Sequence, residues 1–213
     1  MKKQFEILHK AIVYPGFFRM EKYRLKHTLY KGGWSNEISR EVFVRGDCVA
    51  VLLYDPDADN VVLIEQFRAG AILQPDKAWL VEIVAGAIEP GETAIDVAYR
   101  ESLEEAGCEI EALIEINKFY TTPGCSGEWL TLFCAKVDSS KAGGVHGLDD
   151  EDEDILVRVV SFDEAYRQGL KIMDLTAFTL CRENNMPIVV FNMNQEGNLL
   201  RLISGEAVGT VVS

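Results

Sequence analysis

Alternating apolar and polar positions mark the start of the chain as extended. Residues 18–30 alternate between apolar or aromatic side chains and charged ones, and residues 35–46 follow after a turn at Gly32-Gly33. Successive side chains of a strand point to opposite faces, so a period of two predicts strands. We therefore expect residues 1–46 to form a small antiparallel β lobe.

Nearly continuous apolar runs follow this lobe. Residues 48–54 and 60–67 are separated by DPDAD, whose proline and aspartates favour a turn between two buried strands of a hairpin. A third apolar run, residues 79–86, ends in glycine. Three further segments have strand-like patterns: 116–122, 128–137 and 155–162. A short helix is predicted over residues 163–169, with Asp163 as its cap.

A longer helix is predicted between Gly86 and Gly107. It should begin near Thr93, because Glu92 and Thr93 can cap its first turn. It should end at Gly107, which can adopt the left-handed conformation that closes a helix. Apolar side chains continue inside it at helical spacing, at Ala94, Val97 and Ala98.

The composition predicts a globular protein with a sizeable core. The chain has 213 residues, of which 48% are hydrophobic, enough for one large domain or for one domain with a small appendage. Its formal net charge of −13 argues against nucleic acid or an anionic membrane as a partner. No stretch approaches the ~18 apolar residues of a membrane helix. An anionic substrate must therefore be attracted locally, by a few basic side chains and a metal ion.

The five cysteines indicate a reducing compartment. They are odd in number, widely spaced and without a C-x-x-C pair, which favours buried, unpaired thiols over zinc binding or disulfides. Glu6, His9 and Lys10 interrupt the apolar run that a signal peptide requires. We therefore expect a soluble, cytoplasmic protein.

Three carboxylates gather at the end of the longer predicted helix. The pattern G-x5-E-x7-R-E-x2-E-E-x-G starts at Gly86. It places Glu101, Glu104 and Glu105 at i, i+3 and i+4, and therefore on one helical face. Like charges this close repel unless a cation neutralises them, and oxygen ligands alone favour Mg²⁺ or Mn²⁺. An acidic helical face is more often simply solvated, but glycines at fixed offsets and Arg100, which can orient a carboxylate, favour a metal site.

This motif resembles the signature of the Nudix hydrolases at each charged and glycine position. Ser102 departs from it, because the family's pattern has a bulky aliphatic residue there, so packing under the helix is expected to differ. The resemblance implies the Nudix α/β/α sandwich, an α/β fold with a mixed sheet, here preceded by the small N-terminal β lobe. It also implies a set of metal ligands, with two supporting residues: Glu101, Glu104, Glu105 and the carbonyl of Ala85, supported by Glu92 and Arg100.

A wider resemblance, over roughly residues 10–167, is to the bacterial ADP-ribose pyrophosphatase branch of this family. It is carried by segments 28–46, 61–68, 79–86, 122–128 and 144–155. The branch implies Mg²⁺-dependent hydrolysis of ADP-ribose to AMP and ribose 5-phosphate, with Mn²⁺ able to substitute. It further implies a homodimer in which the N-terminal lobe reaches over the partner.

The same resemblance implies substrate contacts for individual residues. Phe17 or Phe18 would stack on adenine, and Arg68 would contact a phosphate. Pro123 would mark specificity for ADP-ribose, although a lone proline is also common as an ordinary loop residue. Further contacts with the substrate would come from Arg40, Glu41 and Arg45.

Catalysis requires a base that takes the proton of the attacking water, and the acidic loop 149–154 is the natural source. By match with the family, Glu151 is the expected base, against the alternative of a merely solvated loop. Glu128 either binds metal or ribose hydroxyls or is an exposed turn residue. The catalytic set is expected to comprise Glu151, Glu105, Arg100 and Glu92.

The last part of the chain has a different character. Residues 170–213 resemble the C-terminal segment of bacterial UMP kinase, notably at 173–180 and 187–194, which makes the chain a candidate hybrid. UMP phosphorylation is not expected, because the glycine-rich N-terminal half of that kinase has no counterpart here. A helix over 171–184 and a buried strand over 187–194 are predicted. The expected division is an N-terminal β lobe (1–46), a Nudix catalytic domain (47–169) and a C-terminal segment (170–213).

Other functions stay open at this point. Another nucleoside diphosphate sugar, such as GDP-mannose, could be the substrate, and Pro123 is the main reason to favour ADP-ribose. A sensor that binds a nucleotide sugar without cleaving it would gain nothing from the paired Glu104 and Glu105. An inactive hybrid, in which the tail disturbs the dimer, is the third alternative.

Overall fold

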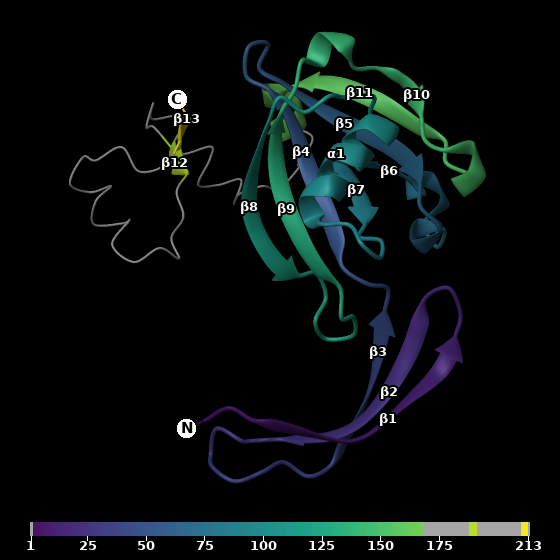
Figure 1. The fold of residues 1–213 in the computed structure, drawn as a ribbon, viewed down its shortest axis with the longest axis vertical. Coiled ribbons are helices and arrows are strands. Elements are labelled where there is room, and N and C mark those ends of the chain that lie inside the picture. The colour runs from purple at the N-terminus through teal and green to yellow at the C-terminus, as the bar shows by residue number, and fades with distance from the viewer. Residues whose placement is uncertain (1, 168–187, 191–209, 213) are drawn as a thin grey trace, which may run out of the picture. The chain divides into compact units, whose positions relative to one another are not determined.

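A computed structural model describes residues 2–167, 188–190 and 210–212 of the chain, and Figure 1 shows their elements. The chain divides into two compact units, Met1–Phe162 and Asp163–Ser213. The N-terminal lobe and the main sheet both belong to the first unit. The division expected from the sequence, at residues 46 and 169, stays a prediction.

The first three strands form the predicted antiparallel lobe. They are β1 (Phe5–Pro15), β2 (Arg19–His27) and β3 (Ile38–Val44), and β2 lies between the other two. Glu21 of β2 is buried, and its carboxylate accepts a hydrogen bond from Tyr23 and pairs with Lys10 Nζ at 3.0 Å. Strand pairing and the contacts of this buried carboxylate thus both hold the lobe together.

The main sheet has eight strands and is mixed, as predicted. In order of pairing its path is β10-β11-β5-β4-β9-β8, while β6 pairs with β5 and β7 pairs with β4. Only β4 and β9 run parallel among its described strands, in register from Cys48↔Leu130 to Tyr54↔Lys136. The strands are β4 (Cys48–Asp55), β5 (Asn60–Phe67), β6 (Trp79–Glu82), β7 (Val84–Ala87), β8 (Ala112–Tyr120), β9 (Trp129–Lys136), β10 (Gly144–His146) and β11 (Ile155–Ser161).

The apolar run 79–86 forms two strands, where the sequence predicts one. The predicted hairpin of β4 and β5 forms, but its two strands pair only near the turn, from Leu53↔Val62 to Asp55↔Asn60. Beyond that point the two strands diverge, and each pairs with a different strand: β5 with β6, and β4 with β7. The split places Ala85 and Gly86 in a strand of their own, next to the helix that follows.

Helix α1 (Ala94–Glu104) begins where the sequence predicts. Thr93 Oγ1 accepts a hydrogen bond from the Asp96 backbone N–H at 3.2 Å, and the Asp96 carboxylate accepts one from the Thr93 N–H at 2.8 Å. This reciprocal pair satisfies two donors of the first turn. Glu92 takes no part in the cap, contrary to expectation, because its carboxylate pairs with Arg100. At the other end Gly107 has a φ of +63°, as predicted.

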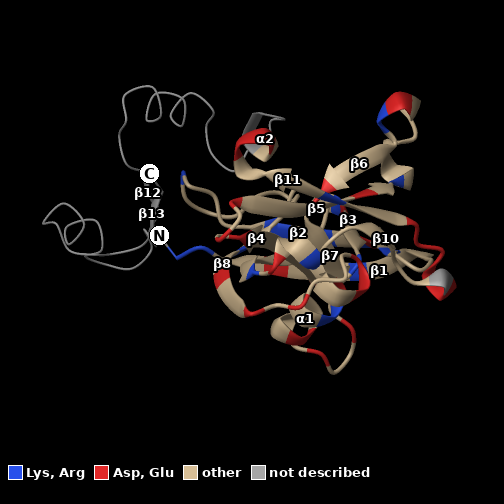
Figure 2. Ribbon diagram, turned by 90° about the horizontal axis from the view of Figure 1, so that it is seen from above, with Lys and Arg blue, Asp and Glu red and all other residues tan. Residues whose placement is uncertain are grey.

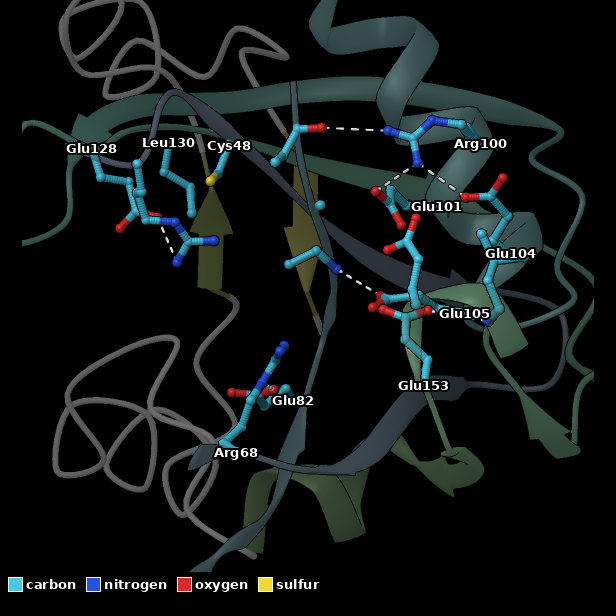
Figure 3. Close-up of a pocket in the computed structure, with 16 residues that line it drawn as sticks. Cys48, Arg68, Glu82, Arg100, Glu101, Glu104, Glu105, Glu128, Leu130 and Glu153 are labelled. Carbon is cyan, nitrogen blue, oxygen red and sulfur yellow. Dashed lines mark hydrogen bonds and ion pairs between the residues drawn. The ribbon is translucent and has the colours of Figure 1, made fainter. Parts of the chain in front are cut away.

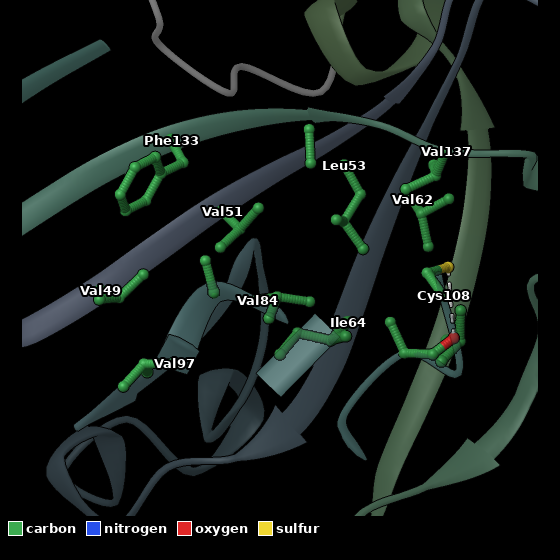
Figure 4. Packing of buried hydrophobic residues seen from close by; sticks show 14 of the residues in the cluster. Val49, Val51, Leu53, Val62, Ile64, Val84, Val97, Cys108, Phe133 and Val137 are labelled. Carbon is green, nitrogen blue, oxygen red and sulfur yellow. Dashed lines mark hydrogen bonds between the residues drawn. The ribbon is translucent and has the colours of Figure 1, made fainter. Parts of the chain in front are cut away.

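The core lies between α1 and the main sheet. Figure 4 shows buried side chains from β4, β5, β7, β9 and α1 packed together: Val49, Val51, Leu53, Val62, Ile64, Val84, Val97 and Phe133. Ser102, which replaces the expected aliphatic residue, is fully buried, and its Oγ donates to the Ala98 carbonyl at 2.7 Å. The serine therefore satisfies its hydroxyl within the helix.

The second unit is described only in part. Helix α2 (Phe162–Arg167) begins one residue before the predicted cap, so Asp163 lies in its first turn. Strands β12 (Ile188–Val190) and β13 (Thr210–Val212) pair antiparallel, so three residues of the predicted strand 187–194 are paired. The predicted helix 171–184 lies outside the described residues.

The four described cysteines are free; Cys48 and Cys108 are buried as predicted, whereas Cys125 is exposed on a loop. None of the described helices has the length and apolar character needed to cross a bilayer.

Candidate functional site

An acidic pocket of about 400 Å³ opens beside the C-terminal half of α1 (Figure 3). Its walls come from β6, β7, α1, the start of β4 and the loop after β10. Seven carboxylates line it, against three guanidinium groups: Glu82, Glu101, Glu104, Glu105, Glu128, Glu151 and Glu153, against Arg45, Arg68 and Arg100. Figure 2 shows that acidic and basic residues are both spread over the elements of the first unit.

The three motif glutamates all line this pocket. Glu101 and Glu104 belong to the last turns of α1, and Glu105 is its buried C-cap residue. The Glu105 carboxylate accepts a hydrogen bond from the Ala85 N–H of β7 at 3.0 Å. A Cβ added at Gly86 would lie 1.8 Å from Glu101 Oε1, so only glycine leaves room for that carboxylate. The first glycine of the motif is therefore explained by the close approach of α1 to β7.

Arg100 connects the acidic residues of the motif. Its Nη1 lies 2.8 Å from Glu101 Oε1 and 3.0 Å from Glu104 Oε2. Its Nε and Nη2 donate to the two oxygens of Glu92, at 2.8 and 3.1 Å. This paired contact holds the pKa of Glu92 below its usual range. Arg100 thus fixes the directions of two pocket carboxylates while Glu92 fixes Arg100.

Burial disfavours the charged forms of two pocket carboxylates. It raises the pKa of Glu105 to about 8 and that of Glu101 to about 7, and the negative charge of Glu153 adds to both shifts. Figure 3 shows Glu153 beside Glu105. Carboxylate oxygens that are buried together in this way are the donors that Mg²⁺ and Mn²⁺ prefer. The donor chemistry therefore fits a hard divalent cation.

The geometry of these donors is not that of a closed metal site. In the part of the chain that the structure describes, no three Asp, Glu, His or Cys side chains converge as ligands of one ion. Instead, Glu101 and Glu104 share Arg100 Nη1. Each of these carboxylates gives one oxygen to Arg100, so the side chains would have to converge through their other oxygens to hold a cation.

The acidic loop brings two carboxylates to the pocket. Glu151 and Glu153 both line it, and the Gly147 N–H donates to the Glu104 carbonyl at 3.2 Å, which attaches the loop to α1. Burial raises the pKa of Glu151, and Glu153 and Asp150 add to the shift. Position alone does not separate Glu151 from Glu153, so the choice of Glu151 as base stays a prediction.

The predicted substrate contacts fall into two groups. Arg45, Arg68 and Glu128 line the pocket, with Arg45 Nη1 3.2 Å from Glu128 Oε1 and Arg68 Nε 2.8 Å from Glu82 Oε2. The others are not among the residues that line it: Phe17, Phe18, Arg40, Glu41 and Pro123.

Phe17 and Phe18 instead border a second hollow, of about 390 Å³, in the N-terminal lobe. Phe17 is 96% exposed, and the two rings meet edge to face at 4.8 Å. Phe18 also packs on Phe43 of β3, whose backbone pairs with the loop 125–127 of the main sheet. An aromatic surface is therefore available for stacking, and Phe18 lies against Arg45 of the acidic pocket, whose guanidinium carbon is 5.6 Å from the ring centroid.

Sequence reasoning missed Cys48 and Glu82 as pocket residues and left Glu153 as one of several acidic loop residues. Glu82 had a signal, because it is the single charged residue in the apolar run 79–86. A charge in a strand that is otherwise apolar requires a partner, and here Arg68 supplies it.

Comparison with known proteins agrees with these features. Residues 44–177 match the model of a family described as the NUDIX domain. An ADP-ribose pyrophosphatase of Escherichia coli (strain K12) is 43% identical over 166 residues, covering 78% of this chain and 79% of that protein. One from Haemophilus influenzae is 42% identical over 169 residues, covering 78% of each.

Two further similarities are more limited. The solved crystal structure of an ADP compounds hydrolase shares the fold, with a TM-score of 0.57 and 19% identity, over 84% of this chain and 93% of that one. A uridylate kinase of Porphyromonas gingivalis is 41% identical over 101 residues, covering 46% of this chain and 42% of the kinase.

Proposed function

This chain belongs to the NUDIX domain family, and from that membership we propose that it hydrolyses ADP-ribose to AMP and ribose 5-phosphate. The choice of substrate is supported by relatives named ADP-ribose pyrophosphatase that match over more than three quarters of this chain. The observation that carries the proposal is the charge of the pocket, with seven carboxylates against three guanidinium groups. Such a pocket repels a pyrophosphate unless divalent cations bind with it.

The cation we propose is Mg²⁺, with Mn²⁺ able to substitute. When bound, it would neutralise the negative charge of the pyrophosphate and polarise the phosphorus that water attacks. The proposed ligands are Glu101, Glu104, Glu105 and the backbone carbonyl of Ala85. Glu153 is added to them by its position beside Glu105.

The other motif residues hold these ligands in place. Glu92 receives two hydrogen bonds from Arg100, and Arg100 in turn contacts Glu101 and Glu104. The Ala85 N–H fixes one oxygen of Glu105. Loss of any of these contacts would leave a carboxylate free to rotate, and a displacement of about 1 Å is enough to slow a reaction strongly.

Glu151 is the proposed general base. It takes a proton from the attacking water while the water oxygen forms a bond to one phosphorus of the pyrophosphate. The bond from that phosphorus to the bridging oxygen breaks, and the bridging oxygen leaves with the other phosphate. The raised pKa of Glu151, caused first by burial, suits a carboxylate that must accept a proton near neutral pH.

The substrate would be held by residues of both groups. We propose that Arg68 contacts a phosphate, and that Arg45 and Glu128 contact the substrate at the other side of the pocket. Further contacts are proposed for lobe and loop residues: Phe17 or Phe18 on adenine, with Arg40, Glu41 and Pro123. Because these residues do not line the pocket of their own chain, we propose a homodimer in which the partner's lobe supplies them.

Incubation of the purified chain with ADP-ribose and Mg²⁺ tests the function directly. AMP and ribose 5-phosphate should form in equal amounts, and Glu105→Gln should slow their formation roughly 100-fold or more, because a catalytic cation contributes several kcal/mol. Glu111→Gln, the same change at an exposed residue paired with Lys136, is the control and should keep full activity.

Three outcomes would contradict the proposal. Faster cleavage of GDP-mannose than of ADP-ribose would assign another nucleoside diphosphate sugar. Tight binding of ADP-ribose without AMP release would indicate a sensor. Neither binding nor release would indicate an inactive chain.

A further inference from the structure

The pocket holds three arginines, and their hydrogen bonds differ. Arg100 uses Nε, Nη1 and Nη2 on protein carboxylates. Arg45 uses Nη1 on Glu128. Arg68 is bound through Nε alone, and within the described residues neither of its Nη atoms donates a hydrogen bond. Arg68 therefore presents two terminal donors that are ready for an anion.

Glu82 is what holds Arg68 in this arrangement. Arg68 follows the last residue of β5, and its backbone N–H donates to the Ala78 carbonyl at 2.7 Å. Glu82 lies on β6, four residues after Ala78, in register with Ile64 of β5. Its Oε2 accepts the Arg68 Nε–H at 2.8 Å, and Figure 3 shows the two side chains together in the pocket.

The contact through Nε leaves both Nη groups of the Arg68 guanidinium available as donors. A guanidinium donates in a rigid planar fork, so fixing Nε also fixes the plane in which both Nη groups point. Two parallel N–H donors match two oxygens of a phosphate.

The charge of Glu82 is otherwise unfavourable here. It adds a seventh carboxylate to a pocket that must receive an anion, and it interrupts an apolar strand. The ion pair with Arg68 offsets both effects, because it neutralises the charge of Glu82 and satisfies its carboxylate.

We propose that Glu82 is a positioning residue that orients Arg68, so that the two Nη groups bind one phosphate of the substrate. The inference rests on the proposed function for the identity of that substrate. It assigns to Glu82 no contact with the substrate or the cation, so every effect of changing Glu82 passes through Arg68.

A double-mutant cycle tests this dependence. The probe is the non-hydrolysable α,β-methylene analogue of ADP-ribose, and its Kd is measured in the presence of Mg²⁺ for four proteins: wild type, Glu82→Ala, Arg68→Ala and the double variant. Glu82→Ala should weaken binding about 10-fold in the wild-type background, and less than about 2-fold when Arg68 is already alanine. Glu82→Gln, which keeps an acceptor for Nε–H, should stay within about 3-fold of wild type.

A purely structural role would give a different pattern. Glu82→Ala would then weaken binding equally in both backgrounds, and that result overturns the inference, as does an unchanged Kd in Glu82→Ala. Glu65→Ala is the matched control, because Glu65 also forms a cross-strand pair from β5, with Arg158, and is not among the pocket residues. It should bind the analogue like wild type.

The same proteins separate this inference from the proposed function. If the wild type binds the analogue but releases no AMP from ADP-ribose, the function fails while the cycle still decides the role of Glu82. If the wild type does not bind the analogue at all, both fail.

Discussion

At the scale of single residues, the site is defined by carboxylates whose burial disfavours the charged form. Glu105 is 2% exposed and receives one backbone hydrogen bond. Its pKa of about 8, like the value of about 7 for Glu101, means that protons and cations compete for the same oxygens near neutral pH. The motif and its family resemblance predict these residues as ligands, but their burial depends on β7 and could not be read from the sequence.

Magnesium affinity should therefore rise with pH. Between pH 6.5 and 8.5 the two carboxylates lose their protons, so the Kd for Mg²⁺ should fall by roughly 10- to 100-fold. The sign for stability without the cation is opposite: a raised pKa favours the folded state at low pH, and that contribution is lost as pH rises from 4.5 through about 8. Calorimetric titration with Mg²⁺ at both pH values measures the first effect.

The matched control for this pH dependence is Glu105→Gln. Removal of the carboxyl that holds its proton most firmly should leave a weaker and flatter dependence, with Glu101 alone contributing. A Kd for Mg²⁺ that is equal at pH 6.5 and 8.5 in the wild type would contradict the assignment of these residues as ligands.

At the scale of elements, the sequence predicts those features that depend only on neighbouring residues, such as the ends of a helix. The start of α1 follows from Thr93, because an N-cap acts within one turn, and the left-handed Gly107 lies three residues after the last residue of the helix. The break in run 79–86 was not predicted, because it depends on where β4 and β5 diverge. An apolar run has the same appearance whether it forms one strand or two. The contact between β7 and α1 is therefore the feature that only the structure provides.

Gly86→Ala should disturb that contact while leaving the fold intact. The added Cβ would lie 1.8 Å from Glu101 Oε1, so the carboxylate must move away from its place in the pocket. We expect kcat/KM for ADP-ribose to fall roughly 10- to 100-fold, with a higher Mg²⁺ requirement. Steady-state kinetics over a range of Mg²⁺ concentrations measure both.

A glycine with free space provides the comparison. Gly124 lies on the loop before β9, and a Cβ there would meet nothing within 4 Å. Gly124→Ala should keep wild-type kinetics. Identical Mg²⁺ dependence in Gly86→Ala and wild type would show that Glu101 does not need the position that glycine allows.

At the scale of the whole molecule, the site draws on parts of the chain that sequence alone does not bring together. Arg45, Arg68 and Glu128 come from three loops and meet in one pocket. The resemblance to known enzymes named them, but no local pattern predicts their proximity. Arg40 and Glu41 stay apart from that pocket, on β3 of the N-terminal lobe. A second copy of the chain is the proposed source of these two residues.

Mixing two inactive variants tests this sharing of residues. Arg40→Ala and Glu105→Gln should each be impaired alone, but a mixed dimer has one pocket in which both residues are intact. After subunit exchange in an equal mixture, activity should recover to about one quarter of wild type, because about half of the dimers are mixed and one of their two pockets works. The AMP assay measures this recovery.

Two changes within one pocket serve as the control. Glu101→Gln mixed with Glu105→Gln should not recover, because every pocket then lacks one of the two carboxylates. Absence of recovery with Arg40→Ala as well, in a protein of single-chain mass by light scattering, would exclude the shared site.

The central position of β4 also determines when the main sheet can be completed during synthesis. β4 pairs with β5 and β7, which are made soon after it, but its parallel partner β9 is made much later. Contacts between distant segments form slowly, and until then the apolar side chains of β4 lack one neighbour. A nascent chain that stalls before Lys136 has left the ribosome would thus expose β4 with one edge unpaired. Such an edge favours aggregation or binding by a chaperone.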